Sequence, residues 1–185
     1  MKQPIQLLSA TILALAASYV SAADFVLTSK DVTNGATLSQ KQVAYGDGCR
    51  GQNISPDLAW QNPPAGTQSF AVIMHDPDAP GAHGWWHWLL FNLPASTNHL
   101  VADAGGYGGK GLPAGAQQSN SSGGSAYWGG ACPPQGDKPH HYNFTVYALK
   151  VPNLAVKPDD SPERVSAAIQ AQAIGSATIT ATYGR

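Results

Sequence analysis

Ionisable and aromatic side chains gather in one stretch of the chain, HDPDAPGAHGWWHWLLFNLP at positions 75–94. Asp76 and Asp78 alternate there with Pro77 and Pro80, and the apolar run before them must end as a strand because proline lacks the N–H that a sheet needs. Two carboxylates on a chain stiffened by prolines suit a preorganised site. The same residues are ordinary in a turn, so this segment alone leaves both interpretations open.

A second stretch brings imidazole and phenol groups to another strand end. The segment GGACPP at 129–134 leads to His140 and Tyr142, where an apolar strand pattern begins. If the two strand ends converge, these side chains meet Asp76 and His87 in one pocket. Imidazole, phenol and backbone N–H groups are the donors that an anion needs, so the pair of segments predicts an anion site.

Carboxylates have the wrong sign of charge for such a site, and two explanations are open. Asp76 or Asp78 can hold a histidine in its charged form by raising its pKa. Alternatively, one carboxylate accepts a proton that the ligand itself carries, which favours monohydrogen phosphate over sulfate. We expect the second effect to contribute.

Other motifs predict no further chemistry. His83 and His87 have a spacing that zinc sites use, but residues four apart on a strand lie about 13 Å apart, so no metal is expected. The run GYGGKG at 106–111 matches G-x-G-x-x-G, yet no strand precedes it and Pro113 blocks a following helix. The sequence also lacks G-x-S-x-G and H-E-x-x-H, two common hydrolase signatures.

The elements that must position these residues are mostly β-strands. Nearly continuous apolar runs at 69–75 and 87–93 are typical of central strands covered on both faces. Residues 25–29, 142–150 and 177–184 carry further strand patterns. Strict alternation along the second run places Trp86 and Trp88 on one face and His87 on the other.

One helix is expected between the last two strands, and one long loop before them. Ser161 is predicted to cap the helix, Pro162 to take its first position and Gly175 to end it. The Gly/Ser-rich segment 105–124 is too polar for a core element, and a loop of this length is usually functional or mobile. The coarse prediction is a mostly β sandwich with a helix before the last strand.

The N-terminus predicts export. Lys2, the apolar run 5–17 and the small residues at 20–23 have the pattern of a secretory signal peptide, which would be cleaved after either Ala22 or Ala23. Residues 1–22 are therefore assigned to the signal peptide and residues 23–185 to one domain. No second apolar stretch approaches the length of a membrane span, so no transmembrane anchoring is expected.

Charge and cysteine content narrow the function classes. Without Lys2 the chain keeps nine basic and eleven acidic residues, a net charge of −2. No basic patch stands out, which argues against nucleic-acid binding. In a periplasmic or secreted protein the two cysteines, Cys49 and Cys132, permit one disulfide. This bridge would close a loop of about 80 residues.

Five motifs together resemble the phosphatidylethanolamine-binding proteins, above all their bacterial Raf-kinase-inhibitor-like branch. They follow the family order over positions 25–183 and read ISPDLAW (54–60), DPDAP (76–80), WWHWLLFNLP (85–94), GGACPP (129–134) and PHHYNFTVYAL (139–149). The resemblance implies a central β-sheet packed against a smaller sheet, with a few peripheral helices. It also implies a small pocket that binds anions, notably phosphate groups.

Matched motif by motif, the resemblance implies a set of ligand-binding residues. These are Asp76, Asp78, His87, Gly130, Pro134, His140 and Tyr142, with Trp86 at the rim. Two departures stand out. Eukaryotic members often have Ser-Arg after DPDAP where this chain has Gly81-Ala82, and the family's His-Arg-Tyr is His-His-Tyr at 140–142. Both losses weaken a fixed attraction for a dianionic headgroup and put lipid binding and kinase inhibition in question.

The sequence is compatible with three functions. The favoured one is an exported, non-enzymatic protein that binds a phosphate-bearing or other small anionic ligand. In this interpretation the protein itself modulates a protein target. The second is an inhibitor of a kinase or peptidase that uses the pocket and the 105–124 loop. The third is a hydrolase with His87 and Asp76 as an acid–base pair, disfavoured because no nucleophile stands beside them. No cofactor is expected, and family relatives make a homodimer an option.

Overall fold

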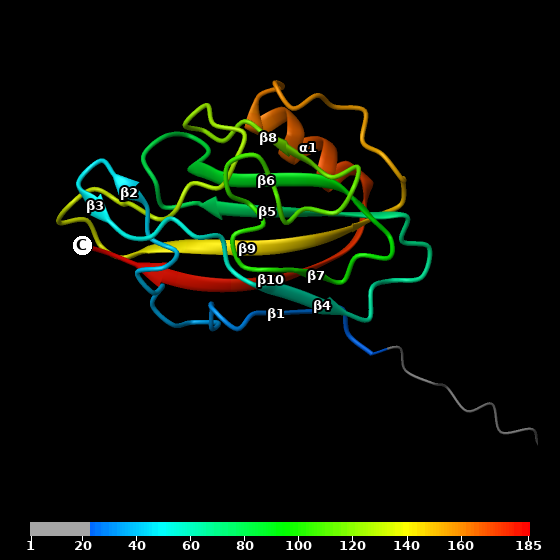
Figure 1. Ribbon diagram of the computed structural model, residues 1–185, viewed down its shortest axis with the longest axis horizontal. Helices are drawn as coiled ribbons and strands as arrows, with labels where there is room; N and C mark the ends of the chain where they lie inside the picture. The colour runs from blue at the N-terminus through cyan, green and yellow to red at the C-terminus, as the bar shows by residue number, and fades with distance from the viewer. Residues whose placement is uncertain (1–22) are drawn as a thin grey trace, which may run out of the picture.

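The strands predicted at 69–75, 87–93 and 142–150 form the centre of a five-stranded antiparallel sheet. The computed structural model describes residues 23–185, so the predicted signal peptide lies outside the described residues (Figure 1). The large sheet has the order β10-β9-β5-β6-β8. Its strands are β5 (Ser69–Asp76), β6 (Trp85–Pro94), β8 (Gln117–Ser119), β9 (His140–Leu149) and β10 (Ala173–Tyr183).

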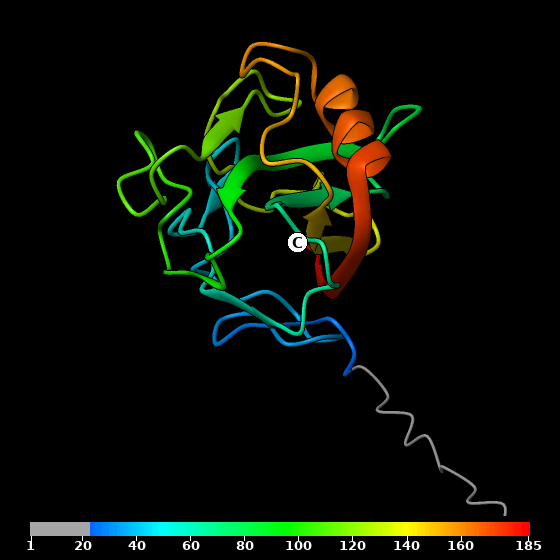
Figure 2. The same cartoon turned by 90° about the vertical axis from the view of Figure 1, so that its right-hand side faces the viewer.

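The two faces of this sheet are covered by different elements, which explains why β5 and β6 carry apolar side chains on both faces (Figure 2). A second antiparallel sheet has the order β1-β4-β7 and packs Leu27, Leu58 and Trp60 against one face. The helix α1 packs Val165 and Ile169 against the other. The remaining bounds are β1 (Val26–Thr28), β4 (Leu58–Gln61), β7 (His99–Leu100) and α1 (Pro162–Gln172).

The mostly β architecture with a smaller second sheet is thus confirmed, and the described residues contain one α-helix. Ser161 caps this helix as predicted, because its side chain accepts a hydrogen bond from the Arg164 N–H. The predicted end at Gly175 is wrong. The helix ends at Gln172 and the chain enters β10 directly, where Gly175 is needed because a Cβ would lie 2.6 Å from Pro64.

The 105–124 segment also differs from its prediction as a loop throughout. Gln117–Ser119 form the edge strand β8, which pairs with Leu89–Phe91 of β6. A polar sequence can form this strand because an edge strand is held by backbone hydrogen bonds to its one neighbour and does not require an apolar side-chain pattern. The rest of the segment is turns and irregular chain.

A β-bulge in β6 decides where His87 points. Met74 pairs with Trp88 and His75 with Trp86, so His87 is the extra residue. A bulge breaks strict alternation and redirects a side chain. The prediction that Trp86 and Trp88 share a face is therefore wrong. Trp88 packs with the second sheet and Trp86 packs on the side of α1.

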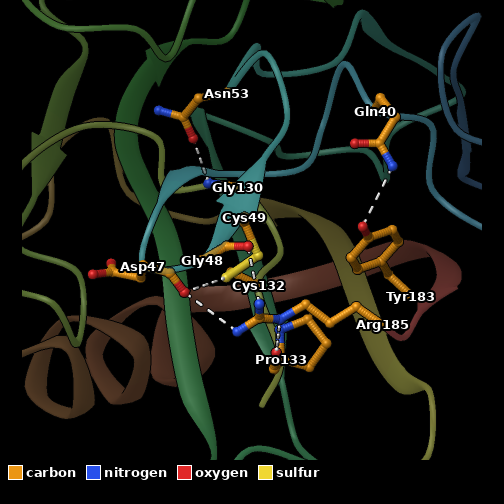
Figure 3. The surroundings of a disulfide bond; sticks show 10 residues. All are labelled: Gln40, Asp47, Gly48, Cys49, Asn53, Gly130, Cys132, Pro133, Tyr183 and Arg185. Carbon is orange, nitrogen blue, oxygen red and sulfur yellow. Dashed lines mark hydrogen bonds between the residues drawn. A yellow bond between two sulfur atoms is a disulfide. The ribbon is translucent and has the colours of Figure 1, made fainter. Parts of the chain in front are cut away.

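The predicted disulfide between Cys49 and Cys132 is confirmed, and it ties a small hairpin to the main body (Figure 3). The hairpin consists of β2 (Tyr45–Gly46) and β3 (Cys49–Arg50). The Arg185 guanidinium adds hydrogen bonds to the carbonyls of Asp47, Gly48 and Pro133. No helix in the described part of the chain is long and apolar enough to cross a membrane.

We expect the double variant Cys49→Ala/Cys132→Ala to lose about 4 kcal/mol of unfolding free energy, because the bridge spans 83 residues and restricts the unfolded chain. Urea denaturation in non-reducing buffer measures this loss. Adding a reductant should destabilise the native protein by a similar amount and leave the double variant unchanged. An unaltered midpoint in the double variant would contradict the prediction.

Candidate functional site

A cavity of about 520 Å³ opens between the β2–β3 hairpin, the start of β6 and the segment that precedes β9. Its walls come from parts of the chain far apart in sequence. The lining residues are Ala44, Tyr45, Asp47, Asn53, Pro80, Trp85, His87, Ser121, Gly123, Ser125, Tyr127, Trp128, Gly129, Gly130, Cys132 and Pro134. Three of the predicted site residues are among them, namely His87, Gly130 and Pro134.

His87 is the buried titratable group of this wall. Its Nδ1 lies 3.0 Å from the Gly129 carbonyl oxygen, which can only accept, so Nδ1 carries the proton. Burial lowers the pKa of His87 to about 4, and the nearby Asp76 charge opposes this shift only in part. The imidazole is therefore neutral near pH 7. In that tautomer Nε2 has a lone pair and accepts a hydrogen bond rather than donating one.

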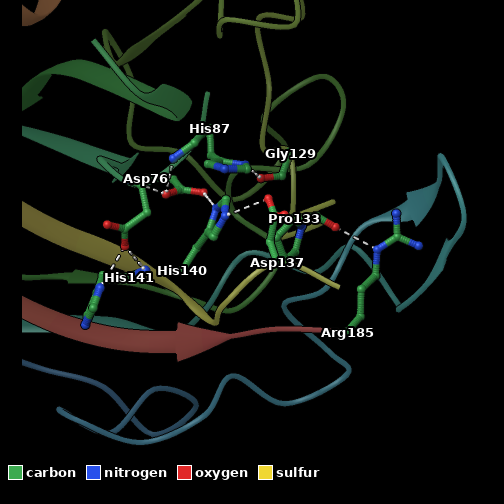
Figure 4. A network of polar contacts seen from close by, with 10 residues as sticks. Asp76, His87, Gly129, Pro133, Asp137, His140, His141 and Arg185 are labelled. Atoms are coloured by element: carbon green, nitrogen blue, oxygen red, sulfur yellow. Dashed lines mark hydrogen bonds and ion pairs between the residues drawn. The ribbon is translucent and has the colours of Figure 1, made fainter. Parts of the chain in front are cut away.

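Asp76 is not among the lining residues and is almost completely buried, with 2% of its surface exposed. Its Oδ1 accepts hydrogen bonds from the N–H groups of Asp78 and Ala79, at 2.9 and 3.0 Å. Its Oδ2 accepts one from His140 Nδ1 at 2.7 Å (Figure 4). Asp76 thus holds the turn after β5 against the first residue of β9, and His87 has a different partner.

Tyr142 supports His87 from within the core. The two rings meet edge to face with their centroids 5.4 Å apart. The Tyr142 hydroxyl is buried and has no hydrogen-bond partner among the described residues. Burial, and then the nearby Asp76 charge, raises the pKa of Tyr142. Tyr142 is not among the lining residues and its ring packs against His87, so its direct contact with a ligand stays a prediction.

Asp78 forms a second link between the same two chain segments, outside the cavity. Its Oδ2 accepts hydrogen bonds from the His141 N–H and from His141 Nδ1, each at 2.7 Å. These hydrogen bonds lower the pKa of the Asp78 carboxyl. The histidine that stands where the family often has arginine is therefore engaged with a carboxylate.

Gly130 is required for packing against the protein's own backbone. A Cβ there would lie 2.5 Å from the Ala44 nitrogen, a contact that real structures do not show. The Gly130 N–H donates to Asn53 Oδ1 at 2.7 Å. Gly130 is thus required by its close approach to residues 42–44, and it also lines the cavity, where its approach to a ligand stays a prediction.

The structure also places Trp86 away from the cavity, on the face that α1 covers. Its ring packs there against that of His75, with the ring centroids 4.8 Å apart. Its neighbour Trp85 lines the cavity instead. Trp85 and Trp86 point to opposite faces because they are adjacent in a strand, whereas the bulge at His87 separates Trp86 from Trp88.

The hairpin residues Tyr45 and Asp47 were also missed by sequence reasoning. Two signals were present. Gly46-Asp47-Gly48 is a strong turn pattern, and the expected bridge from Cys49 to Cys132 brings this turn beside the 129–134 segment.

The charge of the cavity is unusual for an anion site. No lysine or arginine belongs to its lining among residues 23–185, and Asp47 contributes a carboxylate. In the same described part of the chain, no group of three or more His, Cys, Asp or Glu side chains is arranged to hold a metal ion. The wall therefore offers hydrogen-bond acceptors and aromatic rings more than fixed positive charge.

Comparison with known proteins points to one family. A family model described as phosphatidylethanolamine-binding protein matches residues 28–184. The Escherichia coli K12 protein YbcL is 45% identical over 177 residues, which cover 96% of this chain and 97% of YbcL. YbhB of the same organism is 41% identical over 157 residues, 85% of this chain and 98% of YbhB. The crystal structure of E. coli YbcL, described as a new member of the mammalian PEBP family, superposes with a TM-score of 0.86 at 46% identity, covering 88% of this chain and 99% of that one.

The depressed pKa of His87 predicts a specific acid sensitivity. Because the native pKa is about 4 and the ordinary value 6.5, the unfolded chain binds a proton that the native state excludes between these limits. Protonation of His87 in the unfolded chain should therefore lower the free energy of unfolding by about 3 kcal/mol as the pH falls from 6.5 to 4. Urea denaturation across this range should show that His87→Gln removes this part of the pH dependence.

The exposed His83 provides the control, because His83→Gln should keep the full pH dependence of the native protein. If His87→Gln and the native protein lose stability in parallel, His87 is not a buried neutral imidazole.

Proposed function

The chain belongs to the phosphatidylethanolamine-binding protein family, and from that premise we propose that it is an exported, non-enzymatic binding protein. Its cavity takes a small phosphate-bearing or other anionic ligand that carries a proton on one oxygen. Ligand binding and the cavity surface together modulate a protein partner. The observation that carries this proposal is the neutral His87, held by the Gly129 carbonyl in the cavity wall.

The tautomer of His87 selects the ligand's protonation state. A neutral imidazole whose Nδ1–H is already used offers only the Nε2 lone pair. A monohydrogen phosphate donates a hydrogen bond from its P–OH group to that lone pair, whereas an oxyanion without a proton cannot donate one. Sequence reasoning gave this acceptor role to a carboxylate, but both oxygens of Asp76 are engaged with other donors. His87 is the better candidate.

The hydrolase alternative receives less support from the geometry. It needs Asp76 to orient His87 and a nucleophile within hydrogen-bond reach. Asp76 bonds to His140 instead. The Ser121 hydroxyl, which lines the cavity, accepts hydrogen bonds from the N–H groups of Gly123 and Ser125. A binding role is consistent with all of these contacts.

Two features support export. The run of apolar residues 5–17 after Lys2 has the pattern of a signal peptide. The disulfide between Cys49 and Cys132 is of the kind that persists in oxidising compartments. We therefore place the protein in the periplasm or the surrounding medium.

Calorimetry with phosphate and sulfate tests the proposed ligand class. At pH 7 we expect phosphate to bind at least about tenfold more tightly than sulfate, because only phosphate donates to neutral His87. As the pH falls from 7 toward 4, sulfate binding should strengthen by up to about tenfold per pH unit, since His87 must take up a proton to donate to it. Equal affinities at pH 7 would contradict the proposal.

His87→Ala should abolish the thermal shift that phosphate causes. His141→Ala is the matched control, because His141 lies outside the cavity on the Asp78 carboxylate. A phosphate-induced shift that persists in His87→Ala would place the ligand elsewhere.

A further inference from the structure

The cavity is larger and more aromatic than a small oxyanion needs. Its volume is about 520 Å³, and Tyr45, Trp85 and Tyr127 stand along its opening. Tyr45 is 83% exposed and Trp85 is 40% exposed. Large aromatic groups left in contact with water around an opening are typical of surfaces that bind another molecule.

Asp47 supplies an unpaired negative charge to the same opening. Asp47 is one of the residues that line the cavity, and its side chain takes part in no ion pair among residues 23–185. In Figure 3 its carboxylate points away from the guanidinium of Arg185, which bonds to backbone carbonyls instead. The Arg185 guanidinium thus bonds to the protein's own main chain and not to the Asp47 carboxylate.

The hairpin holds Asp47 in place without using its carboxylate. Asp47 has a φ of 49°, between two glycines that also have positive φ, and its carbonyl accepts from Arg185. The adjacent Cys49 is bridged to Cys132. Asp47 is therefore held in a restrained turn that lines the same cavity as Tyr45, Trp85 and Tyr127, and no ion pair engages its carboxylate among residues 23–185.

We propose that Tyr45, Asp47, Trp85 and Tyr127 form an outer subsite that binds an arginine or lysine side chain carried by a protein partner. Aromatic faces attract cations, and arginine also stacks on them. A carboxylate beside the rings completes the recognition of a basic group. This inference rests on the proposed modulation of a partner and names the chemistry of that partner at the cavity.

The aromatic surface continues beyond the cavity, which favours a peptide over a free small cation. Tyr107 is 85% exposed and packs edge to face on Tyr127, with ring centroids 5.6 Å apart. A small ammonium ion would leave this ring in water, whereas a peptide that carries the basic side chain can cover it. Tyrosine, tryptophan and arginine are the residues that dominate protein–protein contacts.

A peptide titration followed by NMR tests the subsite. The probe is a ten-residue glycine–serine peptide with two central arginines, and its counterpart has citrulline, which is neutral and nearly isosteric. We expect the arginine peptide to shift the amide signals of residues 45–48 and the Trp85 indole signal in a saturable way. The citrulline peptide should bind about fivefold more weakly.

The Asp47→Asn substitution should also weaken the binding of the arginine peptide by about fivefold. Asparagine tolerates positive φ, so the turn should survive. Asp103→Asn is the matched control, because Asp103 also has positive φ, 67°, and does not line the cavity. Equal binding of the citrulline peptide, an unchanged Asp47→Asn affinity, or no saturable shift would each overturn the subsite.

Three further arms separate the possible outcomes. Methylguanidinium that binds as tightly as the arginine peptide would overturn the peptide partner, because the cation alone would then be the ligand. The His87→Ala variant should still bind the arginine peptide but no longer bind phosphate. If phosphate displaces the peptide completely from the native protein, the two ligands share one site and the separate outer subsite is overturned. If the native protein binds the arginine peptide and not phosphate, the proposed small ligand fails and the outer subsite stands.

Discussion

The buried carboxylate of Asp76 is the contact on which the arrangement of this site depends. A carboxylate can stay at 2% exposure only if its oxygens are hydrogen-bonded, and three donors satisfy them here. Two come from the turn that follows β5 and one from His140 at the start of β9. The same side chain therefore closes the turn that brings Pro80 to the cavity and joins two strands of the sheet.

This role changes the chemistry of the cavity. The Asp76 carboxylate accepts hydrogen bonds from Asp78, Ala79 and His140, so His87 faces the cavity without a hydrogen-bonded carboxylate. Because it is buried, His87 stays neutral. The Tyr142 hydroxyl is likewise kept in the core. Among residues 23–185, the lining of the cavity then offers hydrogen-bond acceptors and the carboxylate-bearing residue Asp47, and no lysine or arginine. Such a wall favours ligands that bring their own protons and their own positive charge.

The small hairpin is the second structural constraint. It has little core of its own, and it is held by the disulfide and by the hydrogen bonds of Arg185 to its carbonyls. These restraints allow Tyr45 and Asp47 to stand in solvent at fixed positions. One end of the cavity is thus built from a piece of chain that would not hold its place by hydrophobic packing.

The sequence by itself determined the mostly β architecture, the cap of the helix, the bridge between the two cysteines and the family. These follow from local patterns and from motif order, because apolar runs bounded by proline and glycine leave few alternatives. The sequence also brought Asp76, His87, His140 and Tyr142 to one region. What only the tertiary structure decided is which of them meets the cavity. Strand alternation could not reveal the bulge that redirects His87 and separates Trp86 from Trp88, because a bulge arises from pairing with the neighbouring strand. Nor could residue types reveal that Asp76 bonds to His140, since hydrogen-bond partners across 64 residues are chosen by packing.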